Sequence, residues 1–211
     1  MRIDIVSDVV CPWCIIGYKQ LEQALAETDI ATEIHWHPFE LNPTMPADGE
    51  NLREHLAAKY GTTLEESKKA RTKLTALGAE LGFTFNYADD MRMVNTFRAH
   101  QVIHWAGNQG KAHSMKMALF TAFFTYRRDL NDPQVLANAA AEIGLDHDQT
   151  LDVILSERYA QIVRDTEKQW IMRDIHGVPA MIFAERYLLS GAQGVENYKL
   201  VLQQVLNDQA A

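Results

Sequence analysis

The sequence predicts a mixed α/β fold in which a βαβ unit and a ββα unit are separated by a long, all-helical insertion. Two observations carry this prediction: strand-like apolar patterns gather near the two ends of the 211-residue chain, and helical spacing dominates its middle. With 47% hydrophobic residues, the chain can fill a substantial core. We therefore assign residues 1–49 and 176–211 to one domain and residues 50–175 to a helical insertion domain.

The N-terminal part has the order strand, helix, strand. The first predicted strand covers residues 2–7, where Ile3 and Ile5 alternate with polar neighbours. A helix follows over residues 15–27, with apolar side chains at helical spacing. A second strand, over residues 33–39, runs into a proline and a loop that end it.

The remainder of the chain is helical and then returns to strands. Residues 51–175 are divided by glycine and Asp-Pro stops into what we predict to be five or more helices. Strand-like segments reappear over residues 180–183 and 187–189. A last helix, over about residues 195–206, places its apolar side chains on one face.

Composition and charge narrow the classes of partner. The formal net charge of -8 repels a phosphate backbone, so we expect no nucleic-acid partner. No segment approaches the ~20 apolar residues that span a bilayer. The N-terminal segment carries acids at Asp4 and Asp8 and lacks the apolar core of a signal peptide. We therefore expect no membrane partner and a cytoplasmic location.

The two cysteines, Cys11 and Cys14, lie in the turn between the first strand and the first helix. A helix N-terminus offers unpaired N–H groups and a positive dipole end, so we expect a low pKa and good access for Cys11. Pro12 suits the first helical turn, where a missing N–H removes nothing. Cys14, one turn later, can resolve a mixed disulfide formed at Cys11. This placement predicts a redox-active disulfide, with a pair of inert buried thiols as the alternative.

A CxxC spacing also supplies half of many zinc sites. The second half would have to come from histidines, because the sequence holds no further cysteine. His100 and His104 are spaced i, i+4 on a predicted helix, and His35 and His37 share a strand face. We interpret all four as solvated or hydrogen-bonded core histidines. We expect no metal site and no cofactor beyond the redox-active disulfide.

The second diagnostic feature is an X-Pro bond far along the chain. Val178-Pro179 lies between the helical insertion and the third strand. At a strand entrance a cis peptide would place backbone beside the CxxC helix. Together with the CxxC turn, this position predicts a cis bond within contact distance of the cysteine pair.

These features together resemble the DsbA family of the thioredoxin superfamily, and more closely its FrnE-like branch. The resemblance covers nearly the whole chain and also rests on Ser7-Asp8, Glu40-Leu41-Asn42-Pro43, Asn95-Thr96 through Ala99-His100, and Gly191-Ala192-Gln193. It implies a thioredoxin-like fold with a helical insertion. It also implies thiol-disulfide exchange with protein or small-molecule thiols and disulfides, for which glutathione can be a redox partner.

The resemblance assigns roles to particular residues. Cys11 becomes the attacking cysteine and Cys14 the resolving one, and Pro179 becomes a cis-proline that leaves the Val178 backbone to pair with an extended substrate. The implied substrate-binding residues are Pro12, Trp13, Val178, Pro179, Asn95 and His100. For Asn95 and His100, helix capping or packing is an equally weighted alternative. The sequence assigns no oligomeric state and no direction of exchange, although a cytoplasmic location favours reductase or isomerase activity.

Two other functions are compatible with this layout. Kappa-class glutathione transferases and 2-hydroxychromene-2-carboxylate isomerases have a similar layout but carry a serine near the position of Cys11. They also carry an Asp where this chain has Gln193. Both departures favour dithiol chemistry. The third reading is a non-enzymatic, redox-regulated binding module whose helical insertion docks a partner protein.

Overall fold

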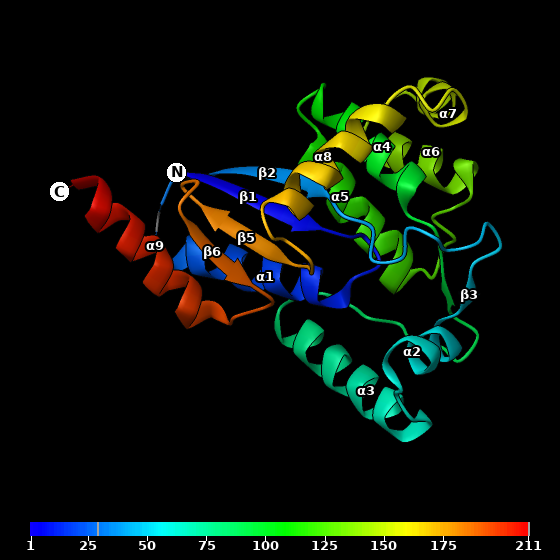
Figure 1. Cartoon of the computed structure of the whole chain (residues 1–211), viewed down its shortest axis with the longest axis horizontal. Helices are drawn as coiled ribbons and strands as arrows, with labels where there is room; N and C mark the ends of the chain where they lie inside the picture. The colour runs from blue at the N-terminus through cyan, green and yellow to red at the C-terminus, as the bar shows by residue number, and fades with distance from the viewer. Residues whose placement is uncertain (29, 211) are drawn as a thin grey trace. The chain divides into compact units, whose positions relative to one another are not determined.

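The computed structural model of the chain describes residues 1–28 and 30–210 (Figure 1). Its contacts divide the chain into two compact units, which are Met1–Leu41 together with the chain from Arg164 onward, and Asn42–Val163. Relative to the sequence assignment, residues 42–49 belong to the helical unit and residues 164–175 to the sheet unit. The C-terminal part of helix α8 (Ala160–Met172) therefore belongs with the sheet unit, because its apolar side chains pack against the sheet.

The first unit is built on a four-stranded sheet in the order β2-β1-β5-β6. Its strands are β1 (Arg2–Ser7), β2 (Glu33–Pro38), β5 (Ala180–Phe183) and β6 (Tyr187–Ser190). The central strand β1 pairs in parallel with β2 and antiparallel with β5, and β5 pairs antiparallel with β6. The predicted strands and the βαβ and ββα order are confirmed.

Three helices accompany this sheet: α1 (Pro12–Thr28), α8 (Ala160–Met172) and α9 (Val195–Ala210). Helices α1 and α9 pack against each other. The ring of Tyr18 on α1 contacts Trp36 of β2, at 5.3 Å between centroids. The next residue of β2 is His37, and its ring contacts that of Trp170 on α8, at 4.7 Å between centroids. Because successive strand residues point to opposite faces, α1 and α8 cover opposite faces of the sheet (Figure 1).

A glycine on α1 allows this helix to lie close to the sheet. A Cβ atom added to Gly17 would lie 3.2 Å from the Met181 methyl group, 3.3 Å from the Tyr198 hydroxyl and 3.4 Å from the Pro179 ring. The first two distances are shorter than ordinary van der Waals contacts. Gly17 therefore lets α1 contact both β5 and the proline that precedes it.

The second unit is predominantly helical. Its elements are β3 (Glu50–Asn51), α2 (Leu52–Tyr60), α3 (Leu64–Glu80), β4 (Arg92–Met93), α4 (Phe97–Gly107), α5 (Ala112–Phe120), η1 (Thr121–Thr125), α6 (Pro133–Glu142) and α7 (His147–Leu155). The short β3–β4 pair and the π-helical turn η1 were not predicted from the sequence. Within the described parts of the chain, no helix combines the length and the apolar character needed to cross a bilayer.

The helix boundaries follow the local signals in the sequence. Helix α2 ends at Gly61, which has a left-handed φ of 68°. Helix α3 begins with a capping box in which Thr63 and Glu66 hydrogen-bond reciprocally. Helix α6 begins at Pro133, and the Asp132 side chain accepts a hydrogen bond from the backbone two residues later. The predicted helix boundaries at Gly61 and at Asp132-Pro133 are therefore confirmed.

Candidate active site

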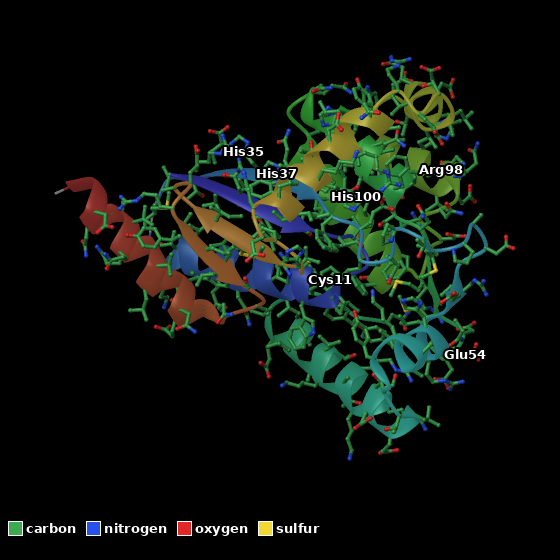
Figure 2. The ribbon with its side chains drawn as sticks, viewed as in Figure 1. Cys11, His35, His37, Glu54, Arg98 and His100 are labelled. Carbon is green, nitrogen blue, oxygen red and sulfur yellow. The ribbon has the colours of Figure 1, made fainter. Side chains whose placement is uncertain are left out.

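The cysteine pair lies at the N-terminus of α1, as its position after β1 predicted (Figure 2). The backbone N–H of Cys11 donates to the Asp8 carbonyl at 3.2 Å, and that of Cys14 donates to the Cys11 carbonyl at 3.1 Å. Both cysteines are free thiols. Cys11 is 4% exposed and Cys14 is fully buried. The pair is therefore a dithiol shielded from solvent, with Cys11 as its outer member.

The outer thiol lies beside the X-Pro bond singled out in the sequence. The Val178-Pro179 peptide is cis. The Cys11 Sγ donates to the Val178 carbonyl at 3.7 Å, across 167 residues of sequence. The prediction that this bond is cis and within contact distance of the cysteine pair is confirmed.

The pKa of Cys11 departs from its ordinary value in the direction opposite to the prediction. The hydrogen bond to Cys14 and the burial of the thiol, followed by the charge of Cys14, raise the pKa well above that of an exposed cysteine. The contact with the Val178 carbonyl adds to this effect because a thiol that donates is stabilised in its protonated form. The prediction of a low pKa rested on the helix N-terminus alone, and burial was not visible from the sequence.

The two residues between the cysteines form the accessible part of the motif. Trp13 is 41% exposed, and Pro12 is half-buried. The structure thus presents an apolar surface beside a nearly buried thiol.

The sheet unit also contains an acidic cluster to which the sequence analysis gave no role. Glu40, just beyond β2, and Glu167 of α8 both pair with the guanidinium of Arg164, also on α8. The backbone N–H of Leu41 donates to the Asp8 carboxylate at 2.8 Å. The motif segments containing Asp8 and Glu40 had been noted, but Arg164 lies 124 residues from Glu40, and no local pattern joins them.

A second ionic cluster, built around the buried Asp4 carboxylate, lies where β1 and β2 meet α8. The Arg2 guanidinium donates two hydrogen bonds to the Asp4 carboxylate, at 2.8 and 2.7 Å. The ring Nε2 of His37, labelled in Figure 2, lies 2.7 Å from Asp4 Oδ1. Burial opposes ionisation of Asp4, but the bonds from Arg2 and His37 outweigh it and lower the Asp4 pKa.

The two predicted substrate-binding residues of the insertion lie in the second unit. Asn95 Oδ1 accepts a hydrogen bond from the Phe97 backbone at 3.0 Å, and its amide donates to the Met45 carbonyl at 3.4 Å. This is the capping arrangement that was weighed against substrate binding. His100 is 2% exposed within α4. Substrate contact by either residue stays a prediction.

The other histidines considered as metal ligands have identifiable neighbours. His35 Nε2 lies 3.0 Å from the Glu33 carboxylate. The His104 ring lies 5.0 Å from that of Tyr159, and burial lowers its pKa. Across the described residues, no three His, Cys, Asp or Glu side chains are grouped as metal ligands.

Comparison with known proteins gives one family and several similar folds. A family model described as a DSBA-like thioredoxin domain matches residues 2–203. The structure of a probable DsbA oxidoreductase from Streptomyces coelicolor, SCO1869, is 30% identical, with a TM-score of 0.91 over 98% of this chain and 90% of its own. A 2-hydroxychromene-2-carboxylate isomerase is 15% identical, with a TM-score of 0.73 over 100% and 98% of the two chains. The cytosolic disulfide reductase DsbM of Pseudomonas aeruginosa, in its structure with glutathione, is 16% identical, with a TM-score of 0.68 over 98% and 100%.

Proposed function

Because the chain belongs to the family of DSBA-like thioredoxin domains, we propose that it is a thiol-disulfide oxidoreductase that acts through Cys11 and Cys14. The observation that carries this proposal is the contact between the Cys11 thiol and the Val178 carbonyl. That carbonyl belongs to the residue before a cis-proline, at the start of β5. The contact thus brings a nucleophile, the Cys11 sulfur, next to an extended backbone segment that can hold a peptide or a peptide-like thiol.

The exchange proceeds in two balanced steps. In the reductive direction, the Cys11 thiol loses its proton, and its sulfur attacks one sulfur of the substrate disulfide. The S–S bond breaks, and the leaving thiolate takes up a proton. Cys14 then loses its proton and attacks Cys11, which releases the second substrate thiol and leaves the Cys11–Cys14 disulfide. A substrate disulfide is reduced by two electrons while the enzyme dithiol is oxidised.

The environment of the dithiol supports reduction as the favoured direction. A strongly oxidising pair needs a stabilised thiolate, because this stabilises the reduced enzyme. Here the hydrogen bond to Cys14 and burial raise the pKa of Cys11, and the thiolate is not favoured. DsbM, a cytosolic disulfide reductase, shares the fold. A low-molecular-weight thiol such as glutathione is a suitable reductant to restore the dithiol, and a cytoplasmic location fits this direction.

Trapping of mixed disulfides tests the two roles. The Cys14→Ala variant should accumulate mixed disulfides through Cys11, because attack survives and resolution does not. Cys11→Ala is the matched control and should trap little. Equal trapping by the two variants would contradict distinct roles for the two cysteines.

Equilibration of the protein with glutathione buffers measures the direction. We expect a reduction potential nearer to that of reducing thioredoxins than to that of oxidising DsbA proteins. A strongly oxidising potential would overturn the reductive assignment but leave the exchange reaction intact. Full biological activity in a Cys11→Ser, Cys14→Ser double variant would instead support a binding module. Turnover of a hydroxychromene substrate by that variant would support the isomerase reading.

A further inference from the structure

The buried hydroxyl of Tyr198 joins the turn after β6 to the last helix. Tyr198 lies on α9 and is fully buried. Its hydroxyl donates to the Gly191 carbonyl and accepts from the Gln193 N–H, each at 3.4 Å. Burial is the largest of the effects that raise the pKa of this hydroxyl to about 12, so it keeps its proton at neutral pH and can donate. One side chain therefore bonds to both ends of the turn 191–193.

Gly191 carries this connection to the cis-proline. Its N–H donates to the Pro179 carbonyl at 2.7 Å. This bond follows directly on the last β5–β6 pair, which is Ala180 with Ser190. A proline has no N–H, so the carbonyl is the one backbone group through which Pro179 can hydrogen-bond to a neighbour. The turn after β6 therefore holds the proline by that group.

The same turn is also fixed to helix α1. The N–H of Gly194 donates to Oε1 of Gln20, a nearly buried side chain on α1, at 2.9 Å. A Cβ atom added to Gly17, one helical turn earlier, would lie 3.3 Å from the Tyr198 hydroxyl and 3.4 Å from the Pro179 ring. The hydroxyl and the proline ring therefore face the same position on α1.

The cis-proline segment is the one that contacts the nucleophile. Val178, just before Pro179, accepts a hydrogen bond from Cys11 Sγ at 3.7 Å. The charge of Cys14 contributes to the raised pKa of Tyr198, so the hydroxyl is also within electrostatic reach of the second cysteine. All of these residues belong to the sheet unit. The segment is thus held at one carbonyl by Cys11 and at the next by the turn after β6.

We propose that Tyr198 is a positioning residue that, through the turn 191–194, holds the backbone of Val178 and Pro179 where an extended peptide substrate pairs with it. The inference rests on the proposed oxidoreductase function and names its substrate class, which is disulfides carried by extended peptides. A binding segment that is already fixed loses less conformational freedom when a substrate docks. Removal of the hydroxyl alone should therefore weaken recognition of a peptide backbone and leave the reactivity of Cys11 toward small disulfides unchanged.

Two probes with the same leaving group separate recognition from thiol chemistry. One is a linear peptide whose single cysteine forms a disulfide with thionitrobenzoate, and the other is mercaptoethanol that carries the same group. In both, the Cys11 thiolate attacks the probe sulfur, the S–S bond breaks, and coloured thionitrobenzoate leaves behind a mixed disulfide. In Tyr198→Phe, release from the peptide probe should be about fivefold slower, which corresponds to one lost neutral hydrogen bond. Release from the mercaptoethanol probe should change by less than about twofold.

Tyr187→Phe is the matched control. It removes another phenol hydroxyl that joins β6 to α9, since the Tyr187 hydroxyl donates to Asp208. Tyr187 pairs with Phe183, at the end of the β5–β6 hairpin away from the cis-proline. Both probes should therefore react with this variant at wild-type rates. Selective slowing of the peptide probe in Tyr187→Phe would contradict the specific role of Tyr198.

Hydrogen exchange at the Gly191 amide reports on the turn directly. The bond to Pro179 protects this amide in the wild type, and we expect faster exchange in Tyr198→Phe. Should that variant fail to fold, Gln20→Met takes its place, because it removes the acceptor of the Gly194 N–H and nearly conserves side-chain volume. Gln20→Met should likewise speed up exchange at Gly191 and slow the peptide probe alone.

Failure of this inference differs from failure of the oxidoreductase function. If the reduced wild-type protein releases thionitrobenzoate from neither probe, the oxidoreductase function is wrong. If Tyr198→Phe slows both probes equally, or slows neither, the exchange reaction stands and Tyr198 does not position the substrate segment. Faster exchange at Gly191 with unchanged peptide kinetics would give the hydroxyl a structural role alone and would also overturn the proposal.

Discussion

The two ionic clusters of the sheet unit each pair a buried carboxylate with a partly exposed arginine, yet the pKa of the carboxylate shifts in opposite directions. In one, Asp4 receives hydrogen bonds from Arg2 and His37, and its pKa is lowered. In the other, Glu40 shares the cation Arg164 with Glu167, and its pKa is raised to about 7. Both carboxylates are almost entirely shielded from solvent. Burial alone therefore does not decide their protonation.

The difference lies in the hydrogen bonds and the neighbouring charges of each carboxylate. Arg2 and His37 make three hydrogen bonds to Asp4, with at least one to each of its oxygens, and these stabilise the charged form. Arg164 donates both to Glu40 and to Glu167, and the burial of Glu40 together with the like charge of Glu167 stabilises the neutral form of Glu40. The first arrangement fixes a charge in the fold, whereas the second creates a group that can titrate near neutral pH.

Removing the shared cation should give the largest effect. Arg164→Met leaves Glu40 and Glu167 buried without a counterion, and we expect a loss of about 3 kcal/mol in the free energy of unfolding at pH 8. Since a raised folded pKa means stability that is lost as pH rises, the deficit should shrink toward pH 5. Urea unfolding at both pH values measures it. A deficit that is equal at the two pH values would contradict the assignment of a titrating Glu40.

Neutralising the other carboxylate should have a smaller effect with the opposite pH dependence. Asp4→Asn weakens the charge-assisted bonds from Arg2 and His37, and we expect a loss of about 2 kcal/mol at pH 7. A lowered folded pKa contributes stability above the unfolded pKa of Asp4 that is lost as pH falls through the folded pKa. The difference between variant and wild type should therefore disappear in acid. Its persistence at pH 2 would show that packing, and not charge, causes the loss.

The histidine of the same cluster should give the next effect. Burial lowers the pKa of His37 despite the bond to Asp4, so protonation disfavours the folded state. Stability should be fully present above about pH 6.5, the unfolded value, and should decline as pH falls toward the lowered folded pKa. In His37→Gln, the free energy of unfolding should fall by about 1 kcal/mol less than in the wild type over the same pH range. An unchanged slope in the variant would show that another group causes it.

An exposed ion pair sets the baseline for these comparisons. Arg158 pairs with Asp152, and their side chains are 54% and 60% exposed. Arg158→Ala should change the free energy of unfolding by less than about 0.5 kcal/mol, with no dependence on pH between 5 and 8. A loss as large as that of Asp4→Asn would mean that exposure does not separate these clusters from ordinary surface pairs.

Local signals in the sequence were sufficient for the strands of the four-stranded sheet and for the helix boundaries, whereas the cis-proline was predicted only in combination with the distant CxxC turn. Ile3 and Ile5 alternate in β1, and Asp132-Pro133 begins α6, because these signals act between neighbouring residues. Cys11 was placed correctly at the start of α1. The direction of its pKa was wrong, because its burial and its contact with Val178 arise from tertiary packing across 167 residues.

The same reason explains what the sequence analysis did not find. Glu40 lies in a segment that the sequence analysis noted, but Arg164 is 124 residues away and only the fold brings the two together. The π-helical turn η1 continues α5 without any Gly or Pro to mark the change. The β3–β4 pair joins two-residue segments, which are too short to show alternation. Long-range pairing and short elements are therefore the parts that required the structure.

The position of β1 in the sheet has a consequence for synthesis on the ribosome. Ile3 pairs with Phe183, so one edge of β1 stays without its partner until 180 further residues have been added. At typical synthesis rates of about 5 to 20 residues per second, this wait lasts on the order of ten seconds or more. Helices form within microseconds, so the chain from Asn42 to Val163 can fold during that interval. The dithiol at the end of β1 therefore reaches its place beside Val178 only after that distant segment has been synthesised.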